Sequence, residues 1–168
     1  MSLSMHSASI PYFVRALNNL FVILKKGAAH AEEHEIDPSI FVAGRLFPDM
    51  LPLSRQVQIA CDVSKLAAAR ISGIEAPSFE DNESNFDELL SRINKTIKFL
   101  NSLPAEKING TEEKEIKFQA GPHELDFTGA TYLSTWALPN IYFHVTTTYN
   151  ILRHNGVVLG KLDYVGAP

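Results

Sequence analysis

The sequence contains little cysteine and no excess of basic residues. A single cysteine, Cys61, allows no internal disulfide in this chain of 168 residues, which agrees with a reducing compartment. Lys and Arg number 15 against 19 Asp and Glu, so the net charge is −4. The basic footprint of a protein that binds DNA or RNA is therefore absent. We expect a cytoplasmic protein that does not bind nucleic acid.

Long apolar runs are also missing. No run approaches the roughly 20 residues that a membrane helix needs, and the best one, Ile10 to Leu24, is interrupted by Arg15. The first six residues lack the basic start and the apolar centre of a signal peptide. We expect no membrane association. Hydrophobic residues make up 45% and charged residues 20%, which is ordinary for a globular protein, and the length predicts one domain over residues 1–168.

Several catalytic and nucleotide-binding motifs are absent. The sequence has no P-loop, no glycine-rich dinucleotide turn, no HExxH, no GxSxG and no CxxC. Their absence removes the commonest nucleotide-binding, zinc-protease and hydrolase classes. Composition and common motifs alone therefore point to no particular reaction.

Four long segments carry the apolar spacing of three and four residues that is typical of amphipathic helices. Pro11 suits the first turn of the first helix, Gly73 suits the end of the second, and Pro139 should kink the fourth. The expected segments are Ser9 to about His34, Asp49 or Leu51 to Ile71, Asn82 or Ser84 to Pro104, and Thr128 to His154.

A different pattern precedes the last helix. Residues 115–119 and 124–127 alternate polar and apolar side chains around Gly121, which indicates a β-hairpin. Four amphipathic helices bury their apolar faces best as a bundle. The sequence therefore predicts an all-α four-helix bundle with a long first crossover, a small hairpin before the last helix, and an apolar tail, residues 157–168, packed on the surface as an extended arm.

Two polar pairs on the predicted helices are candidates for a site. Asn140 and His144 are four residues apart and share a helix face, on which Thr148 comes next. Gln58 and Asp62 have the same spacing on the second helix, within an otherwise apolar run. Facing polar pairs inside a bundle can hold a metal or a small molecule.

Structural roles explain the same residues without a site. Asn140 can bond a backbone carbonyl that the kink at Pro139 leaves free. The run of three threonines, 146–148, is unusual inside a helix, and at least one hydroxyl should bond back to the helix backbone. Amide side chains such as that of Gln58 are also poor ligands for transition metals.

Several stretches form specific motifs over nearly the whole chain. They are Ile10–Leu20, Ile36–Pro38, Arg45–Asp62, Pro77–Asp81, and Pro139–Thr147 with Leu152–Val157. Together they resemble a bacterial family of unknown function within the DinB/YfiT-like superfamily. The resemblance implies a four-helix bundle with a long first crossover, and it implies a homodimer.

The resemblance also implies a metalloenzyme fold. Metal-binding members of that superfamily carry one histidine on the second helix and two, spaced by four, on the last, and some are thiol-dependent transferases or isomerases. His144 matches the second histidine of the last-helix pair, and Asn140 stands in place of the first. Gln58, or else Asp62, stands in place of the histidine on the second helix. The implied site is degenerate, with zinc or nickel held by His144 and Asp62.

Three hypotheses follow. In the first, the protein binds a small molecule between helices, and any chemistry uses His144 as acid or base with Asp62 orienting it. The pocket expected in that case is formed by Gln58, Asp62, Asn140, His144 and Thr148, with Tyr142 or Tyr149 as a wall. In the second, the protein is a metal-dependent, thiol-linked transferase or a hydrolase-like enzyme. In the third, it is a dimeric stress-response or interaction module without catalysis.

Overall fold

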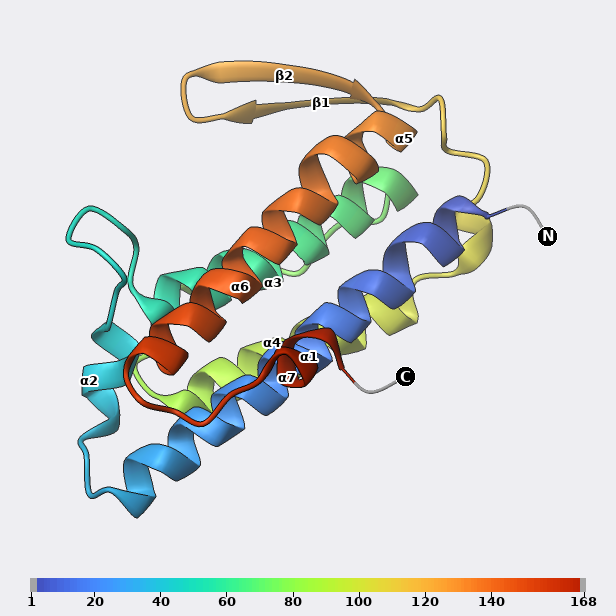
Figure 1. Cartoon of the computed structure of the whole chain (residues 1–168). Helices are drawn as coiled ribbons and strands as arrows, with labels where there is room; N and C mark the ends of the chain where they lie inside the picture. The colour runs from blue at the N-terminus through green and yellow to red at the C-terminus, as the bar shows by residue number, and fades with distance from the viewer. Residues whose placement is uncertain (1–2, 167–168) are drawn as a thin grey trace.

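The computed structural model describes residues 3–166, which are mostly helical with one small antiparallel sheet (Figure 1). The elements in chain order are α1 (Met5–Glu33), α2 (Pro38–Ala43), α3 (Leu53–Ser72), α4 (Phe86–Ser102), η1 (Ala105–Lys107), β1 (Glu115–Ala120), β2 (His123–Thr128), α5 (Gly129–Thr131), η2 (Tyr132–Ala137), α6 (Leu138–His154) and α7 (Lys161–Val165).

The four long helices pack around one apolar core. Helix α3 packs against α6 and α4, and α1 packs against α4 and α6; Figure 1 shows α3 beside α6 and α1 beside α4. Buried apolar side chains come from all four helices, among them Leu17, Val57, Ile93 and Ile141. The mostly helical class with one hairpin agrees with the sequence prediction.

Helix α1 begins earlier than predicted. Ser4 and Ser7 form a capping box, so the helix begins at Met5 and Pro11 lies inside it rather than in its first turn. The serine pair satisfies N–H groups at the helix start, and this fixes the N-terminus upstream of the proline. By length and composition α1 could cross a membrane, but 44% of its most apolar window is buried inside the protein, as in the core helix of a bundle.

The ends of α3 and α4 are set by local backbone chemistry. Gly73 ends α3 in the left-handed conformation at φ 76°, as predicted. Glycine suits this position because any side chain there would be strained. Helix α4 is capped by Asn85, whose side chain accepts from the Glu88 N–H. Neither of the predicted caps, Asn82 and Ser84, has this role, and the Ser84 N–H instead donates to the Glu88 carboxylate at 2.6 Å.

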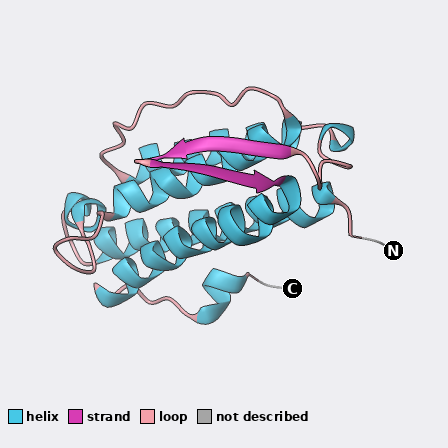
Figure 2. Cartoon of the chain, turned by 90° about the horizontal axis from the view of Figure 1, so that it is seen from above, coloured by secondary structure: helices cyan, strands magenta, loops and turns pink. Residues whose placement is uncertain are grey.

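The predicted hairpin is confirmed and rests on the start of the last helical region. Strands β1 and β2 pair antiparallel from Glu115–Thr128 to Ala120–His123, and Figure 2 shows the hairpin lying across the helices. Phe118 and Phe127 contact the rings of Tyr132 and Trp136. A two-stranded sheet is marginal alone, and these aromatic contacts hold it on the helices.

The last long helix is irregular at the predicted position. Residues Tyr132–Ala137 form a π-helical stretch directly before α6, and Pro139 occupies the first turn of α6. Proline has no N–H to continue an α-helical ladder, so a wider turn precedes it. After α6, Gly156 adopts φ +93°, in the left-handed region that favours glycine.

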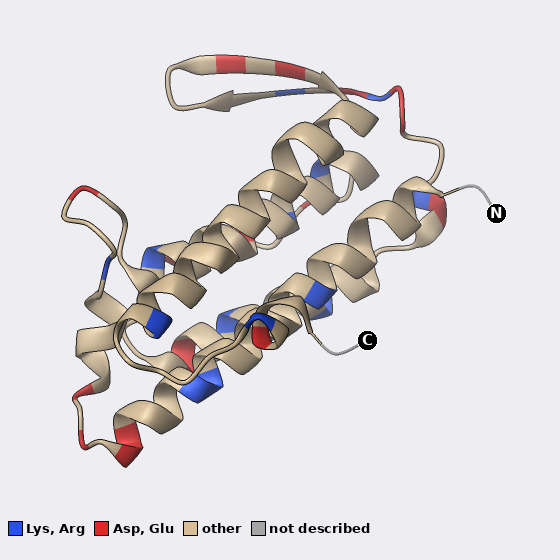
Figure 3. Cartoon of the chain, in the orientation of Figure 1, with Lys and Arg blue, Asp and Glu red and all other residues tan. Residues whose placement is uncertain are grey.

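The C-terminal arm packs on α1, as expected, but it is not extended throughout. Val157 and Leu159 are buried, and the chain then forms the short helix α7 against α1. Charged side chains are unevenly distributed along the fold, since α6 carries no Asp, Glu, Lys or Arg before Arg153 (Figure 3). Residues 167–168 of the predicted arm lie outside the described part of the chain.

Candidate functional site

His144 lies in the interior between α6 and α3. Its side chain is 9% exposed, and Nδ1 lies 2.7 Å from Oε1 of Gln56. The Gln56 amide nitrogen donates to the Leu51 carbonyl at 3.0 Å, so its oxygen faces the imidazole and accepts. Nδ1 therefore carries the proton and Nε2 keeps the lone pair. Burial lowers the pKa of His144 to about 4, which leaves the ring neutral at pH 7.

Asp62 belongs to a different group of residues, around the buried guanidinium of Arg92. Nη2 of Arg92 lies 2.9 Å from Oδ1 of Asp62 and 3.0 Å from Oδ1 of Asp81, and Nη1 donates to Glu83 at 3.0 Å. Lys65 also lies 3.0 Å from the same Asp62 oxygen. Asp62 thus ties α3 to α4 and to the loop between them.

Gln58 joins this charged group and not the imidazole. Its amide nitrogen donates to Glu83 at 2.8 Å, and its oxygen accepts from Arg55 at 2.6 Å. The polar contacts of Gln58 and Asp62 are therefore with the group around Arg92, whereas the side-chain partner of His144 is Gln56. Residues two apart on a helix point about 200° apart, so Gln56 faces α6 while Gln58 faces the α3–α4 loop.

Asn140 and Thr148 have structural roles on α6. The Asn140 amide donates to the Trp136 carbonyl at 2.7 Å, and the Thr148 hydroxyl, which is buried, donates to the His144 carbonyl at 2.9 Å. Thr147 bonds back to the helix in the same way. The structural interpretation of these residues agrees with this geometry, since Asn140 bonds a carbonyl of the π-helical stretch and both threonines bond carbonyls one turn back on α6.

The side chains present do not fit the metal centre that the resemblance implies. Within residues 3–166, no three His, Cys, Asp or Glu side chains are grouped so as to hold a metal ion. The predicted ligand Asp62 is occupied by Arg92 and Lys65, and the group facing His144 is an amide. One imidazole beside one amide is a poor donor set for zinc or nickel.

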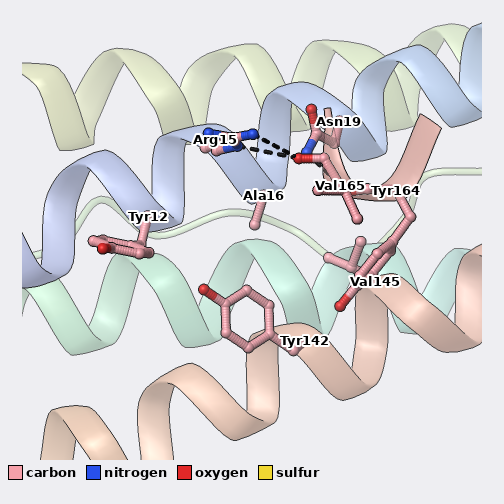
Figure 4. Close-up of a pocket in the computed structure, with 8 residues that line it drawn as sticks. All are labelled: Tyr12, Arg15, Ala16, Asn19, Tyr142, Val145, Tyr164 and Val165. Atoms are coloured by element: carbon pink, nitrogen blue, oxygen red, sulfur yellow. Dashed lines mark hydrogen bonds between the residues drawn. The ribbon is translucent and has the colours of Figure 1, made fainter. Parts of the chain in front are cut away.

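A cavity of about 380 Å³ lies on the other side of α6, between α1, α6 and α7 (Figure 4). We call it the tyrosine pocket. Its lining residues are Tyr12, Arg15, Ala16 and Asn19 from α1, Tyr142 and Val145 from α6, and Tyr164 and Val165 from α7. Of the predicted ligand-binding residues, only Tyr142 lines it. Tyr142 thus lines a cavity that is formed with other residues than those predicted to surround it.

The pocket combines apolar surface with phenol groups. In Figure 4 the Tyr142 ring stands between Tyr12 and Tyr164. The hydroxyls of these three tyrosines have no hydrogen-bond partner within the described residues. Burial raises the pKa of the Tyr142 phenol, and Tyr164 and Tyr12 add to the shift while Arg15 opposes it. The phenol therefore stays protonated at neutral pH and is able to donate a hydrogen bond.

Tyr149 supports one wall of the pocket from behind. Its ring meets that of Tyr164 edge to face at 6.4 Å between centroids, and its hydroxyl lies 3.4 Å from the Leu159 carbonyl. It does not line the cavity. It instead positions Tyr164 and the segment that leads to α7.

Sequence reasoning missed Gln56 and most of the tyrosine pocket. Gln56 and Gln58 are both glutamines among apolar residues, so residue type could not separate them. Tyr12 and Tyr164 lie near opposite ends of the chain, and nothing in their local pattern pairs them. The only available signal was the pairing of Tyr12 with Arg15 on one face of an apolar helix, at the spacing of three residues.

Comparison with known proteins places the chain in a family. A crystal structure of a DinB family member protein from Shewanella denitrificans matches with a TM-score of 0.87 and 36% identity, over 97% of this chain and 92% of that chain. None of the curated proteins matches the sequence. Residues 5–165 match the family described as "Domain of unknown function (DUF1993)". The chain is thus a DinB-like protein and belongs to this family of uncharacterised function.

Proposed function

We propose that this protein binds a small, largely apolar molecule in the tyrosine pocket. The proposal depends on the pocket itself: a cavity of about 380 Å³ that three helices border and that is partly open to solvent, with three phenol hydroxyls that have no partner in the described residues. Ligand pockets commonly have volumes of roughly 300–1,000 Å³, with apolar walls and a few polar groups that orient the ligand. The ligand expected here has an aromatic or aliphatic body and a group that hydrogen-bonds phenols.

The positive charge of Arg15 at the wall narrows the ligand class. The guanidinium lies in the lining, where it brings positive charge to the cavity. A ligand with a negative group is therefore favoured over a cationic one. His144 does not line this pocket, so it is not placed to transfer a proton to a molecule held there, and we propose binding rather than catalysis at this site.

The probe for this proposal is 8-anilinonaphthalene-1-sulfonate, an aromatic sulfonate whose fluorescence rises in apolar sites. Titration of the wild-type protein should give one site per chain. Tyr142→Ala removes a central aromatic wall and should weaken binding about tenfold or more. The matched control is Phe143→Ala on the same helix, whose ring is 56% exposed and lies outside the pocket lining.

The dye affinities of the two variants, compared with wild type, test whether the dye binds in the pocket. Circular dichroism and thermal melts first establish that both are folded. Wild-type affinity in Tyr142→Ala, or a larger loss in Phe143→Ala, would place the dye on the general surface and refute the proposal.

The wider organisation follows from the sequence and is proposed with the binding function. The chain is one domain over residues 1–168, and its helices form the DinB-type four-helix bundle with a long first crossover. Residues 34–52, which include α2, make the connection from α1 to α3, and this length supports the crossover. The protein is cytoplasmic and forms a homodimer.

A further inference from the structure

The C-terminal helix closes one side of the tyrosine pocket. Tyr164 and Val165 of α7 complete the lining that α1 and α6 begin. In Figure 4, Tyr164 and Val165 stand at one end of the labelled residues and Tyr12 at the other, with Tyr142 between them. A molecule held in the pocket would therefore touch the last helix of the described chain.

Three side chains of α1 hold this wall through polar contacts. Nε and Nη2 of Arg15 donate to the Val165 carbonyl at 3.1 and 3.0 Å. The Asn19 amide donates to the Tyr164 carbonyl at 2.8 Å. Lys26 forms an ion pair with Asp163 at 2.5 Å, in which the lysine side chain is 45% exposed. An exposed pair of this kind is weak and is screened by salt.

Little apolar surface anchors α7 itself. None of its residues is buried, and Leu162 is 75% exposed. The chain just before it is firmly anchored, because Val157 and Leu159 are buried at 1% and 6% exposure. Gly160 separates the two parts, and the space where its side chain would lie is open. Segments with few buried apolar contacts open locally at low free energy, so α7 can leave while residues 157–159 stay in place.

We propose that residues 161–166 form a strap that swings away from α1 about Gly160, admits a small molecule to the tyrosine pocket and closes over it. This inference rests on the proposed binding function. It adds that the rate of exchange is set by release of the three polar contacts and of the Tyr164 ring.

A reversible disulfide tests the strap directly. A Cβ at Gly166 would lie 3.3 Å from Cγ of Asn19, so cysteines at these two positions are near enough to be joined across the strap. The double variant Asn19→Cys with Gly166→Cys should therefore lock the strap when oxidised and free it when reduced. Gly166 adopts φ +80°, where a side chain is strained, so the reference for the oxidised protein is the reduced form of the same double variant and not wild type. The native Cys61 is fully buried, and burial raises its pKa to about 12, so it does not compete for the new thiols.

The readout is stopped-flow fluorescence with the same anilinonaphthalene sulfonate. Oxidised protein should take up and release the dye at least about tenfold more slowly than the same sample after reduction. Equal rates in the two states, with the crosslink verified by mass spectrometry, would overturn the strap and leave pocket binding intact. Absence of dye binding in both states and in wild type would instead refute the proposed binding function.

A second pair of variants tests the strap without a crosslink. Lys26→Met removes the ion pair with Asp163, and Lys25→Met removes the adjacent charge, whose side chain forms no ion pair within residues 3–166. Lys26→Met should speed dye release and amide hydrogen exchange in residues 161–166 about twofold to fivefold, the scale of one exposed pair. Lys25→Met should match wild type. Equal exchange in the two variants and wild type would contradict the strap even if the disulfide fails to form.

Discussion

The buried imidazole of His144 has no acidic partner among residues 3–166. Its Nδ1–H is bound by the neutral Gln56 amide, and the nearest candidate from the sequence, Asp62, is bound to Arg92 and Lys65 instead. Burial lowers the pKa of His144 to about 4, whereas a histidine in an unfolded chain titrates near 6.5. Between these values the unfolded chain binds a proton that the folded chain does not, so acid favours unfolding.

This difference in the pKa of His144 between the folded and unfolded chain predicts that the free energy of unfolding depends on pH through this residue. The stability that neutral His144 allows is complete above about pH 6.5 and is lost as the pH falls toward 4, with a loss of about 2–3 kcal/mol by pH 4.5. Urea unfolding at pH 7.5 and 4.5 measures it. His144→Gln should lose that much less stability between the two pH values than wild type does. An equal loss in both proteins would show that His144 is not the titrating group.

The side chain of Arg92 anchors the loop between α3 and α4. The guanidinium, 1% exposed on its side chain, joins Asp62 of α3 to Asp81 and Glu83 of the loop, and it donates to the Glu80 carbonyl at 3.1 Å. The Pro77–Asp81 stretch, which the sequence singled out as a family motif, therefore has a structural role. It brings the Asp81 carboxylate and the Glu80 carbonyl to one buried cation.

Removal of that cation should release the loop. Arg92→Ala leaves three carboxylates close together without their shared partner, so we expect a loss of about 2–4 kcal/mol in the free energy of unfolding. Limited proteolysis should cut within residues 74–85 sooner than in wild type. Lys98→Ala, an exposed change on the same helix, should be neutral within about 0.5 kcal/mol. Wild-type stability and proteolysis in Arg92→Ala would show that the contacts do not anchor the loop.

The surface of the whole molecule carries exposed apolar side chains that one copy of the chain leaves uncovered. Phe47 is 64% exposed and Phe143 is 56% exposed. The proposed homodimer depends on the family resemblance, and the exposed rings of Phe47 and Phe143 are candidates for its interface. Sedimentation equilibrium at micromolar concentration should give about twice the chain mass of 18.6 kDa. A single-chain mass across that concentration range would refute the dimer and leave the two aromatic side chains exposed in solution.

Much of the helical framework could be predicted, because apolar periodicity and capping act within a few residues. The apolar spacing of three and four residues predicted the long helices, Gly73 predicted the end of α3, and the alternation around Gly121 predicted the hairpin. Helix starts were less certain, since Ser, Asn and Asp near a boundary can all cap. At Asn85 and Ser4 the three-dimensional course of the chain decided among similar candidates.

The sequence by itself determined which residues form helices and which faces are apolar, since both depend on local spacing. Only the tertiary structure decided which polar side chain faces which neighbour. A shift of two residues on α3 separates Gln56, beside His144, from Gln58, beside Glu83. The tertiary structure also brings Tyr12 and Tyr164 from opposite ends of the chain to one pocket, because the packing of α7 on α1 depends on contacts that no local pattern encodes.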